Sequence, residues 1–371
     1  MWKIPFNNIV KADRNIKDRI LRRIQKNMES GDFILGKEVK KFEYKFAAYI
    51  GKKYCVGVNS GTSALEIGIK ALNLKKGNII THSNSYIATA FGIIKNEQAV
   101  NFVDIDENSL MIDVNKIEQN ITDETVAICV AHLYGNAANI DKILEITAKY
   151  NLKLIEDCAQ SHGAKYNGQM VGSFGDISCF SFYPTKNLGC YGDGGAICTN
   201  NKEVYERMLK LRNLGSPDNI NFDMIGDNTR LDSIQACVLL EKIKELDYNN
   251  NLRHEKAMMY YDGLKEINII KLPQITSGVN CVWHLFVVRV LHNNRDNLYN
   301  YLRSKGVECK IHYAKPIHKQ SIFKTDSKLY LPYTEQICDE IISLPFHPYI
   351  DETEIKYIVD IIKSYQPDKK Y

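Results

Sequence analysis

Lys186 has the surroundings expected of a lysine that takes part in covalent chemistry. It follows the apolar run ISCFSF and the pair Tyr183-Pro184, and it precedes a glycine-rich return from Gly192 to Gly195. A lysine among small and aromatic residues loses hydration, which lowers the pKa of its amine and makes it a nucleophile able to form a Schiff base. An exposed loop lysine is the common alternative, and it would be preferred if this segment stood alone.

A carboxylate, Asp157, ends the apolar run LKLIED. At the carboxyl end of a buried strand it would be partly desolvated, so we expect a cationic group to face it. Gln160 and His162 follow closely enough to face the same crevice. The alternatives are a helix N-cap or an internal salt bridge for Asp157, and a structural, hydrogen-bonded role for His162.

A turn that could bind an anion is predicted at Gly61, Thr62 and Ser63, within NSGTSALEIGIKAL. It opens a helix directly after a predicted strand, so free backbone N–H groups, two hydroxyls and the positive end of the helix dipole converge there. A capping box formed by Ser63 and Glu66 would explain the same residues without a ligand. The turn is neither a Gly-Lys-Ser/Thr phosphate loop nor a G-x-G-x-x-G dinucleotide turn.

Alternating strands and helices would bring these groups together. Seven short apolar runs are predicted as strands: YCVGV, NIITH, AVNFVDI, TVAICVAHL, LKLIED, ISCFSF and GAICTN. Helical stretches separate several of them, which predicts an α/β fold with a mostly parallel sheet covered by helices on both faces. Such sheets bind ligands at the carboxyl ends of their strands.

Further helices are predicted on both sides of this region. Before it lie the amphipathic stretches RILRRIQKNMESGDF and EVKKFEYKFAAYIG, and after it lies LDSIQACVLLEKIKEL. The run DYNNNLRHE near Asn249 is interpreted as a boundary. We therefore predict a large α/β domain over residues 1–249 and a smaller α+β domain over residues 250–371. The smaller one would contain a strand in CVWHLFVVRV and helices in RDNLYNYLRSKG and YIVDIIKSY.

The composition excludes several classes of protein. The 371 residues include 48 Lys and Arg against 44 Asp and Glu, a formal charge of +4, which argues against a nucleic-acid partner. Ten cysteines never form a C-x-x-C pair and several lie in apolar runs, which predicts buried thiols rather than disulfides. The nine histidines lack zinc-ligand spacing, so no metal is expected. Without a signal peptide or membrane span, the prediction is a soluble, cytoplasmic protein.

Taken in order, the motifs resemble the DegT/DnrJ/EryC1/StrS family, the nucleotide-sugar aminotransferases of fold-type I that depend on pyridoxal 5'-phosphate (PLP). The resemblance covers nearly the whole chain through ILGKEV, FAAYIG, GTSAL, SYIATA, HLYG, EDCAQSHGA, FSFYPTKNLG, NTRLDSIQA, IHYAKPIHKQ and LPFHPYI. It implies the cofactor PLP and a homodimer with shared active sites.

The resemblance implies a role for each matching residue around the cofactor. Lys186 would hold PLP covalently, Asp157 would pair with the pyridinium nitrogen, Tyr86 would stack on the ring and Gln160 would lie near the ring hydroxyl. The residues implied to bind the phosphate are Gly61, Thr62, Ser63 and Ser181, with Asn228 reaching the phosphate of the neighbouring subunit. The residues implied to approach the sugar nucleotide are Tyr183, His312, Tyr313, Lys315 and His318, with the Lys315 charge suited to a diphosphate.

The implied reaction moves the amino group of L-glutamate to a nucleotide-linked keto-sugar, with Lys186 carrying the proton. The segments IHYAKPIH and LPFHPYI favour C3 of a dTDP-3-oxo-6-deoxyhexose. Amino sugars of this kind serve products such as lipopolysaccharide or S-layer glycans. The alternatives are amination at C4 of a dTDP- or UDP-linked 4-oxo-6-deoxy sugar and, from another class, a non-catalytic regulatory protein that binds PLP.

Two further possibilities and two departures bear on this interpretation. A dehydratase branch of the family has histidine where this chain has Lys186, and a nicotinamide oxidoreductase would need the missing glycine fingerprint. The tyrosine of the family's G-Y-N run is Asp227 here, which changes the surroundings of Asn228. The late motif is IHYAKPIHKQ, residues 311–320. The proline that is common in the family at one of its positions is Ala314 here, which changes the substrate side of the site.

Overall fold

A seven-stranded sheet forms the centre of the computed structural model, which describes residues 2–218, 220–326, 329–367 and 369. The strand order is β1-β9-β8-β5-β4-β2-β3. Every strand runs in one direction except β9, which is antiparallel to both of its neighbours. The predicted α/β fold with a mostly parallel sheet is thus confirmed. The strands are β1 Tyr54–Val58, β2 Asn78–His82, β3 Ala99–Val103, β4 Thr125–Ala131, β5 Lys153–Asp157, β8 Ile177–Ser181 and β9 Gly195–Thr199.

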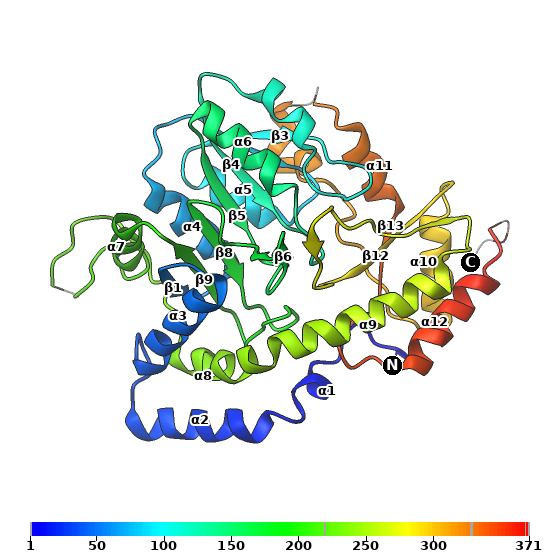
Figure 1. The fold of residues 1–371 in the computed structure, drawn as a ribbon, viewed down its shortest axis with the longest axis horizontal. Coiled ribbons are helices and arrows are strands. Elements are labelled where there is room, and N and C mark those ends of the chain that lie inside the picture. Colours follow the sequence, from blue (N-terminus) through cyan, green and yellow to red (C-terminus); the bar gives the residue numbers. More distant parts are fainter. Residues whose placement is uncertain (1, 219, 327–328, 368, 370–371) are drawn as a thin grey trace.

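Helices cover both faces of this sheet (Figure 1). Neighbouring residues of a strand point to opposite layers, as in β4, where Cys129 packs toward one side and Ile128 toward the other. Because both faces are buried, the strands read as nearly continuous apolar runs. One layer contains α4 (Gly61–Leu72), α5 (Ile87–Ile94) and α7 (Lys202–Leu211), and the other contains α3 (Lys37–Ile50), α6 (Ile140–Tyr150) and α8 (Ser233–Lys242).

The N-terminal segment is helical, as predicted. A short α1 (Ile9–Asp13) precedes α2 (Lys17–Ser30), which packs against α8 through Ile20 and Val238. Gly31 and Gly51 end α2 and α3 in the left-handed conformation, with φ of 66° and 81°.

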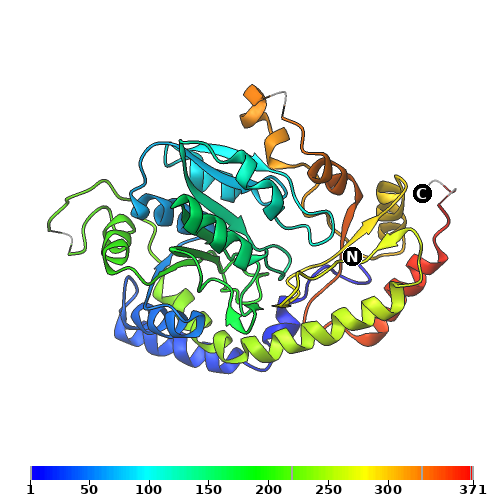
Figure 2. The same ribbon diagram turned by 45° about the horizontal axis from the view of Figure 1, so that its top comes forward.

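A single long helix, α9 (Leu246–Leu264), passes through the predicted boundary at Asn249. It runs from beneath the central sheet to the C-terminal elements (Figures 1 and 2). These include the sheet β10-β12-β13, whose core joins Tyr260 of α9 to Phe286 and Leu344. The division at residue 249 stays a prediction. The elements are β10 Ile270–Lys271, β12 Phe286–Val290, β13 Ile341–Leu344, α10 Arg295–Ser304, α11 Pro332–Glu340 and α12 Glu352–Ser364.

The predicted strand CVWHLFVVRV is only half right. Phe286–Val290 form β12, whereas residues 281–285 leave the sheet, with Trp283 at φ 48°. Val282 donates its N–H to the carbonyl of Gly135 at 3.0 Å, so this segment bonds to the loop between β4 and α6 instead of to a strand.

Smaller elements complete the fold. A three-stranded sheet has the order β11-β6-β7, with β6 Lys165–Tyr166, β7 Gln169–Met170 and β11 Val279–Asn280. Short 3-10 turns cover Val114–Lys116, Glu118–Asn120, Ile243–Glu245, Ile317–Lys319 and Ser321–Asp326.

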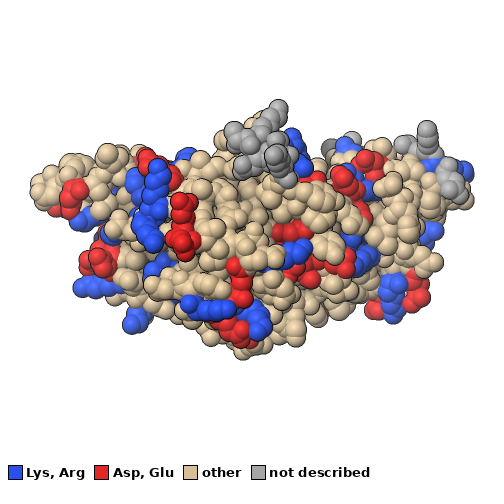
Figure 3. Space-filling view, turned by 90° about the horizontal axis from the view of Figure 1, so that it is seen from above, with Lys and Arg blue, Asp and Glu red and all other residues tan. Residues whose placement is uncertain are grey.

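The side-chain predictions from composition can be compared with the structure. All ten cysteines are buried free thiols, as predicted. Among the described residues, no helix is long and apolar enough to cross a membrane. Basic and acidic side chains are interspersed over the face seen in Figure 3.

Candidate active site

A cavity of about 470 Å³ lies at the carboxyl ends of the parallel strands and gathers most of the predicted site residues. Ser63, the residue after Thr62, does not line this cavity. Lys315 lines an adjoining hollow, and Tyr86 and Tyr313 line both the cavity and the hollow. Asn228 and His318 line neither of them. The predicted residues that line the cavity are Gly61, Thr62, Tyr86, Asp157, Gln160, Ser181, Tyr183, Lys186, His312 and Tyr313.

Lys186 is held in a tight turn between β8 and β9. Its backbone N–H donates to the carbonyl of Tyr183 at 2.9 Å, and the turn is closed by a bond from the N–H of Cys190 to the carbonyl of Phe182 at 2.8 Å. The side chain is half-buried and has no hydrogen bond or ion pair with any described residue. Burial lowers the pKa of the Lys186 amine to about 8. The alternative of an exposed loop lysine is therefore wrong.

Asp157 ends β5 with a buried carboxylate. Oδ2 accepts a hydrogen bond from Thr89 Oγ1 at 2.8 Å, and Oδ1 accepts one from the N–H of Ala159 at 3.1 Å. Burial raises the pKa of Asp157, whereas these two donors and the more distant Lys186 oppose the increase. In the part of the chain that the structure describes, Asp157 has no ion pair within 4 Å, and Lys186 is the cationic side chain that acts on it from a greater distance.

The turn predicted to bind an anion begins α4, but the residue that caps the helix is Ser60. Ser60 Oγ accepts from the N–H of Ser63 at 3.1 Å, so the alternative of a capping box beginning at Ser63 is wrong. The N–H groups of Gly61 and Thr62 have no partner among the described residues and lie at the positive end of the helix. The turn also approaches the end of β8 closely, because a Cβ on Gly61 would lie 2.6 Å from Ser181 Cβ.

Gln160 links the large unit to the late motif. Its Oε1 accepts from the N–H of Tyr134 at 2.8 Å, and its Nε2 donates to the Tyr313 hydroxyl at 3.0 Å. Tyr134 in turn donates its hydroxyl to the carbonyl of His312 at 2.6 Å. Tyr86 precedes α5 and is 57% exposed, and its ring centroid lies 5.8 Å from that of Tyr313. The HLYG motif carries no local signal that would predict this role of Tyr134.

The two histidines of the late motif have different environments. His312 lines the cavity, bonds through Nδ1 to Ser343 Oγ at 2.8 Å, and has its pKa lowered to about 4 by burial, so it is neutral at physiological pH. His318 is buried, with Nδ1 bonded to Ser83 Oγ at 2.7 Å and Nε2 to Glu335 Oε1 at 3.0 Å. Both ring nitrogens of His318 are therefore engaged away from the cavity.

Comparison with known proteins identifies the source of this arrangement. The model of the DegT/DnrJ/EryC1/StrS aminotransferase family matches residues 14–363. The chain belongs to this family. It is therefore a PLP-dependent nucleotide-sugar aminotransferase.

Individual relatives agree over their full length. The chain is 43% identical, over 98% of its length and 99% of the relative, to a dTDP-3-amino-3,6-dideoxy-alpha-D-galactopyranose transaminase of Aneurinibacillus thermoaerophilus. Among solved structures, S. venezuelae DesV in complex with a ketimine intermediate matches with a TM-score of 0.95 and 34% identity, over 100% of both chains. NtdA from Bacillus subtilis, with bound cofactor PMP, matches with a TM-score of 0.89 and 30% identity over 98% of this chain and 86% of that one.

The residues present suit the cofactor of this family. PLP needs a reactive amine, a carboxylate for its ring nitrogen and an anion site. Among the described residues, the Lys186 amine has no hydrogen bond, the buried Asp157 carboxylate has no ion pair, and the N–H groups of Gly61 and Thr62 have no acceptor. These groups line one cavity.

His284 is a cavity residue of the aminotransferase that no sequence motif indicated. Asn187, next to Lys186, donates both hydrogens of Nδ2, to Asn250 Oδ1 at 2.8 Å and to the carbonyl of Val282 at 2.9 Å. Its Oδ1 must therefore accept from His284 Nδ1 at 3.0 Å, so the hydrogen-bond network assigns the proton to Nδ1 and leaves Nε2 as an acceptor. Burial, together with Lys186, holds the pKa of His284 well below its usual value. Because His284 lies in a segment that was predicted as part of a strand, no role in the site was predicted for it.

A cluster of His132, which lines the cavity, with Glu156 and Cys158 has atoms that could bind a metal, but two of its residues have other partners. The Glu156 carboxylate accepts from the N–H groups of Gly172, Phe174 and Gly175 at 2.6 to 2.9 Å. His132 Nδ1 accepts from the N–H of Ala138 at 3.2 Å, and Nε2 lies 3.3 Å from Glu156. The Glu156 carboxylate and the His132 ring are thus bonded to each other and to backbone N–H groups, so these two residues support the loop after β5.

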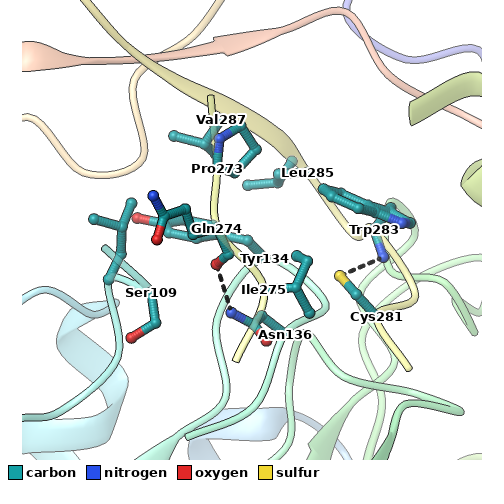
Figure 4. A pocket seen from close by; sticks show the side chains of 11 residues that line it. Ser109, Tyr134, Asn136, Pro273, Gln274, Ile275, Cys281, Trp283, Leu285 and Val287 are labelled. Carbon is teal, nitrogen blue, oxygen red and sulfur yellow. Dashed lines mark hydrogen bonds between the residues drawn. The ribbon is translucent and has the colours of Figure 1, made fainter. Parts of the chain in front are cut away.

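A second cavity adjoins the site through Leu285 but is far smaller, at about 20 Å³ (Figure 4). Tyr134, Trp283 and other largely apolar side chains line it, and Asn136 Nδ2 donates to the carbonyl of Gln274 at 3.3 Å. A space of this size holds about one water molecule, so it is not a substrate pocket.

Proposed function

We propose that the aminotransferase moves the amino group of L-glutamate to C3 of a dTDP-3-oxo-6-deoxyhexose. The observation that carries this proposal is the full-length similarity to the Aneurinibacillus transaminase, whose name specifies a dTDP-linked 3-amino-3,6-dideoxy sugar. The product would then be a precursor for glycans such as lipopolysaccharide or the S-layer. Ten buried free thiols are consistent with action in the reducing cytoplasm.

Lys186 and Asp157 have complementary tasks in this proposal. When bound, PLP supplies an electron sink for the negative charge that develops at the amino-acid Cα. Lys186 Nζ would hold the cofactor, and once freed by glutamate it would take up and carry the proton of the amino-acid Cα. Asp157 would pair with the pyridine nitrogen. The same two residues would serve the sugar ketone in the second half of the reaction.

The proposal assigns the remaining cofactor contacts to other residues in or next to the cavity. The free N–H groups of Gly61 and Thr62 would bind the phosphate together with the Ser181 hydroxyl. The N–H of Ser63 is occupied by Ser60, so only its hydroxyl is available. Tyr86 would cover the ring, and Gln160 would face the ring hydroxyl with its remaining amide hydrogen.

The sugar nucleotide would occupy the side of the cavity formed by the late motif. Tyr183, His312 and Tyr313 line the cavity, and the adjoining hollow, also about 470 Å³, is lined by Lys315 and Phe91. An exposed lysine beside aromatic rings suits a nucleoside diphosphate. His318 is omitted from this set because both of its ring nitrogens are bonded elsewhere.

We propose that the active unit is a homodimer in which Asn228 serves the neighbouring site. Asn228 is exposed and lies in the loop between α7 and α8, part of which projects beyond α7 (Figure 1). In this loop Ile220, Phe222 and Ile225 are 76, 61 and 86% exposed. Exposed apolar side chains of this size favour burial against another subunit.

The test is incubation of the holoenzyme with glutamate and a panel of dTDP- and UDP-linked 3-oxo and 4-oxo sugars, followed by mass spectrometry and NMR. We expect the amine at C3 of a dTDP-linked 3-oxo-6-deoxy sugar. An amine at C4, or a preference for UDP, would refute that part of the proposal. An unchanged cofactor spectrum on addition of glutamate would favour the regulatory alternative.

A further inference from the structure

We propose that Thr89 is a positioning residue that fixes the carboxylate of Asp157 toward the cofactor ring. The inference rests on the proposed function and deepens it. Thr89 does not line the cavity, and its role would be exerted through Asp157.

The Asp157 carboxylate determines which hydroxyl donates and which accepts in the hydrogen bonds around Thr89. Thr89 is fully buried in the first turn of α5, with Oγ1 2.8 Å from Asp157 Oδ2 and 3.0 Å from Ser85 Oγ. An ionised carboxylate only accepts, so Thr89 donates to Asp157. Its single proton is then used, and Ser85 must donate to Thr89. The result is a directed chain from Ser85 through Thr89 to the carboxylate, in which each bond strengthens the next.

Asp157 depends on this donor because its other stabilisation is weak. The carboxylate is buried and, within the described residues, has only the N–H of Ala159 as a second donor. Burial favours its neutral form, and the Thr89 hydroxyl is the largest of the influences that oppose this. A neutral or rotated Asp157 would hold the proton of the ring nitrogen poorly.

The position of Thr89 in α5 also couples two sides of the cofactor site. Tyr86, which would cover the ring, is the residue directly before α5, and the N–H of Thr89 donates to the Tyr86 carbonyl at 3.1 Å. A helical threonine hydroxyl commonly bonds the carbonyl one turn back. Here it bonds to Asp157 instead, so one helical turn sets both the aromatic cover and the carboxylate.

The experiment compares Thr89→Val, which removes the donor at nearly constant shape, with Thr89→Ser, which keeps it. Thr334→Val is the matched control, because Thr334 is also fully buried and donates to Asp104 Oδ1 at 2.7 Å, outside the cavity. Three quantities are measured on each holoenzyme: the PLP dissociation constant, the pH titration of the bound cofactor's absorbance, and the rate of the half-reaction with glutamate.

For Thr89→Val we expect a half-reaction slowed about 10- to 100-fold, the range for a hydrogen bond to a charged group, with the KM for glutamate nearly unchanged. The absorbance titration should also shift, whereas Thr89→Ser should restore both quantities. Thr334→Val should lower the melting temperature without affecting the cofactor.

A Thr89→Val enzyme that melts earlier but keeps the wild-type titration and rate would overturn the proposal. If Thr89→Val does not fold, Thr89→Cys replaces it as a weak donor of similar size, and wild-type behaviour of that variant would be equally decisive. The titration is read without glutamate or sugar, so it tests Thr89 separately. Failure of the wild-type enzyme to react with glutamate would instead contradict the proposed function.

Discussion

Replacing Gly61 with alanine is a direct test of the proposed phosphate site. The added Cβ would lie 2.6 Å from Ser181 Cβ and 3.1 Å from Ser181 Oγ. Non-bonded carbon atoms normally approach to about 3.5–4.0 Å, so the turn and the end of β8 must separate by about 1 Å. The two elements that would move are those proposed to bind the phosphate.

The size of the effect can be estimated from its parts. Overpacking of this kind costs about 1–3 kcal/mol of stability. A separation of about 1 Å would also break at least one charge-assisted hydrogen bond to the phosphate, which lowers affinity about 10- to 100-fold. Both losses are expected together in Gly61→Ala.

The assay titrates the apo-protein with PLP and, in parallel, with pyridoxal, which lacks the phosphate. Gly61→Ala should weaken PLP binding about 10- to 100-fold and leave pyridoxal binding nearly unchanged, because only PLP uses the altered turn. The control is Gly263→Ala in α9, whose Cβ would meet Val359 Cγ2 at a comparable 2.7 Å but far from the cavity. It should lower the melting temperature alone. Equal losses for PLP and pyridoxal would refute the placement of the phosphate at Gly61.

Four further predictions follow from the site. Lys186→Ala should abolish turnover and the attachment of PLP by borohydride, and substantial remaining transamination would contradict the assignment. Asp157→Asn should fold normally but react about 10²-fold more slowly or worse, whereas a near-normal rate would exclude its role toward the ring. The pKa of Lys186 is lowered to about 8, and only the neutral amine attacks PLP. The rate of PLP attachment to the apo-protein should therefore rise with pH through 8 and then level off. A rate profile with its midpoint near the ordinary lysine pKa of 10.5 would contradict this prediction. Mixing Asn228→Ala and Lys186→Ala subunits in equal amounts should restore about a quarter of the wild-type activity, because about half of the dimers are mixed and each mixed dimer has one intact site of two. No recovery would mean that Asn228 serves its own subunit.

The sequence predicted the central sheet well because its signals are local. All seven strands were identified, since strands buried on both faces are apolar throughout. A helix through Asn249 was not predicted, because the polar run DYNNNLRHE was interpreted as a domain boundary, and that division stays a prediction. There, tertiary burial of Leu246, Arg253 and Tyr260 on one side maintains a helix through those residues.

Lys186, Asp157 and the turn at Gly61 could be predicted from sequence alone, because each combines a reactive residue type with a recognisable strand end or helix start. The tertiary structure decided which groups act on them. Thr89 reaches Asp157 across 68 residues, Asn187 reaches His284 across 97, and Tyr134 reaches the carbonyl of His312 across 178. Contacts between such distant residues depend on how the layers pack, and no local pattern of residue types encodes them. The sequence therefore determined the reactive groups, and only the packed fold determined their orientation, their tautomers and their pKa values.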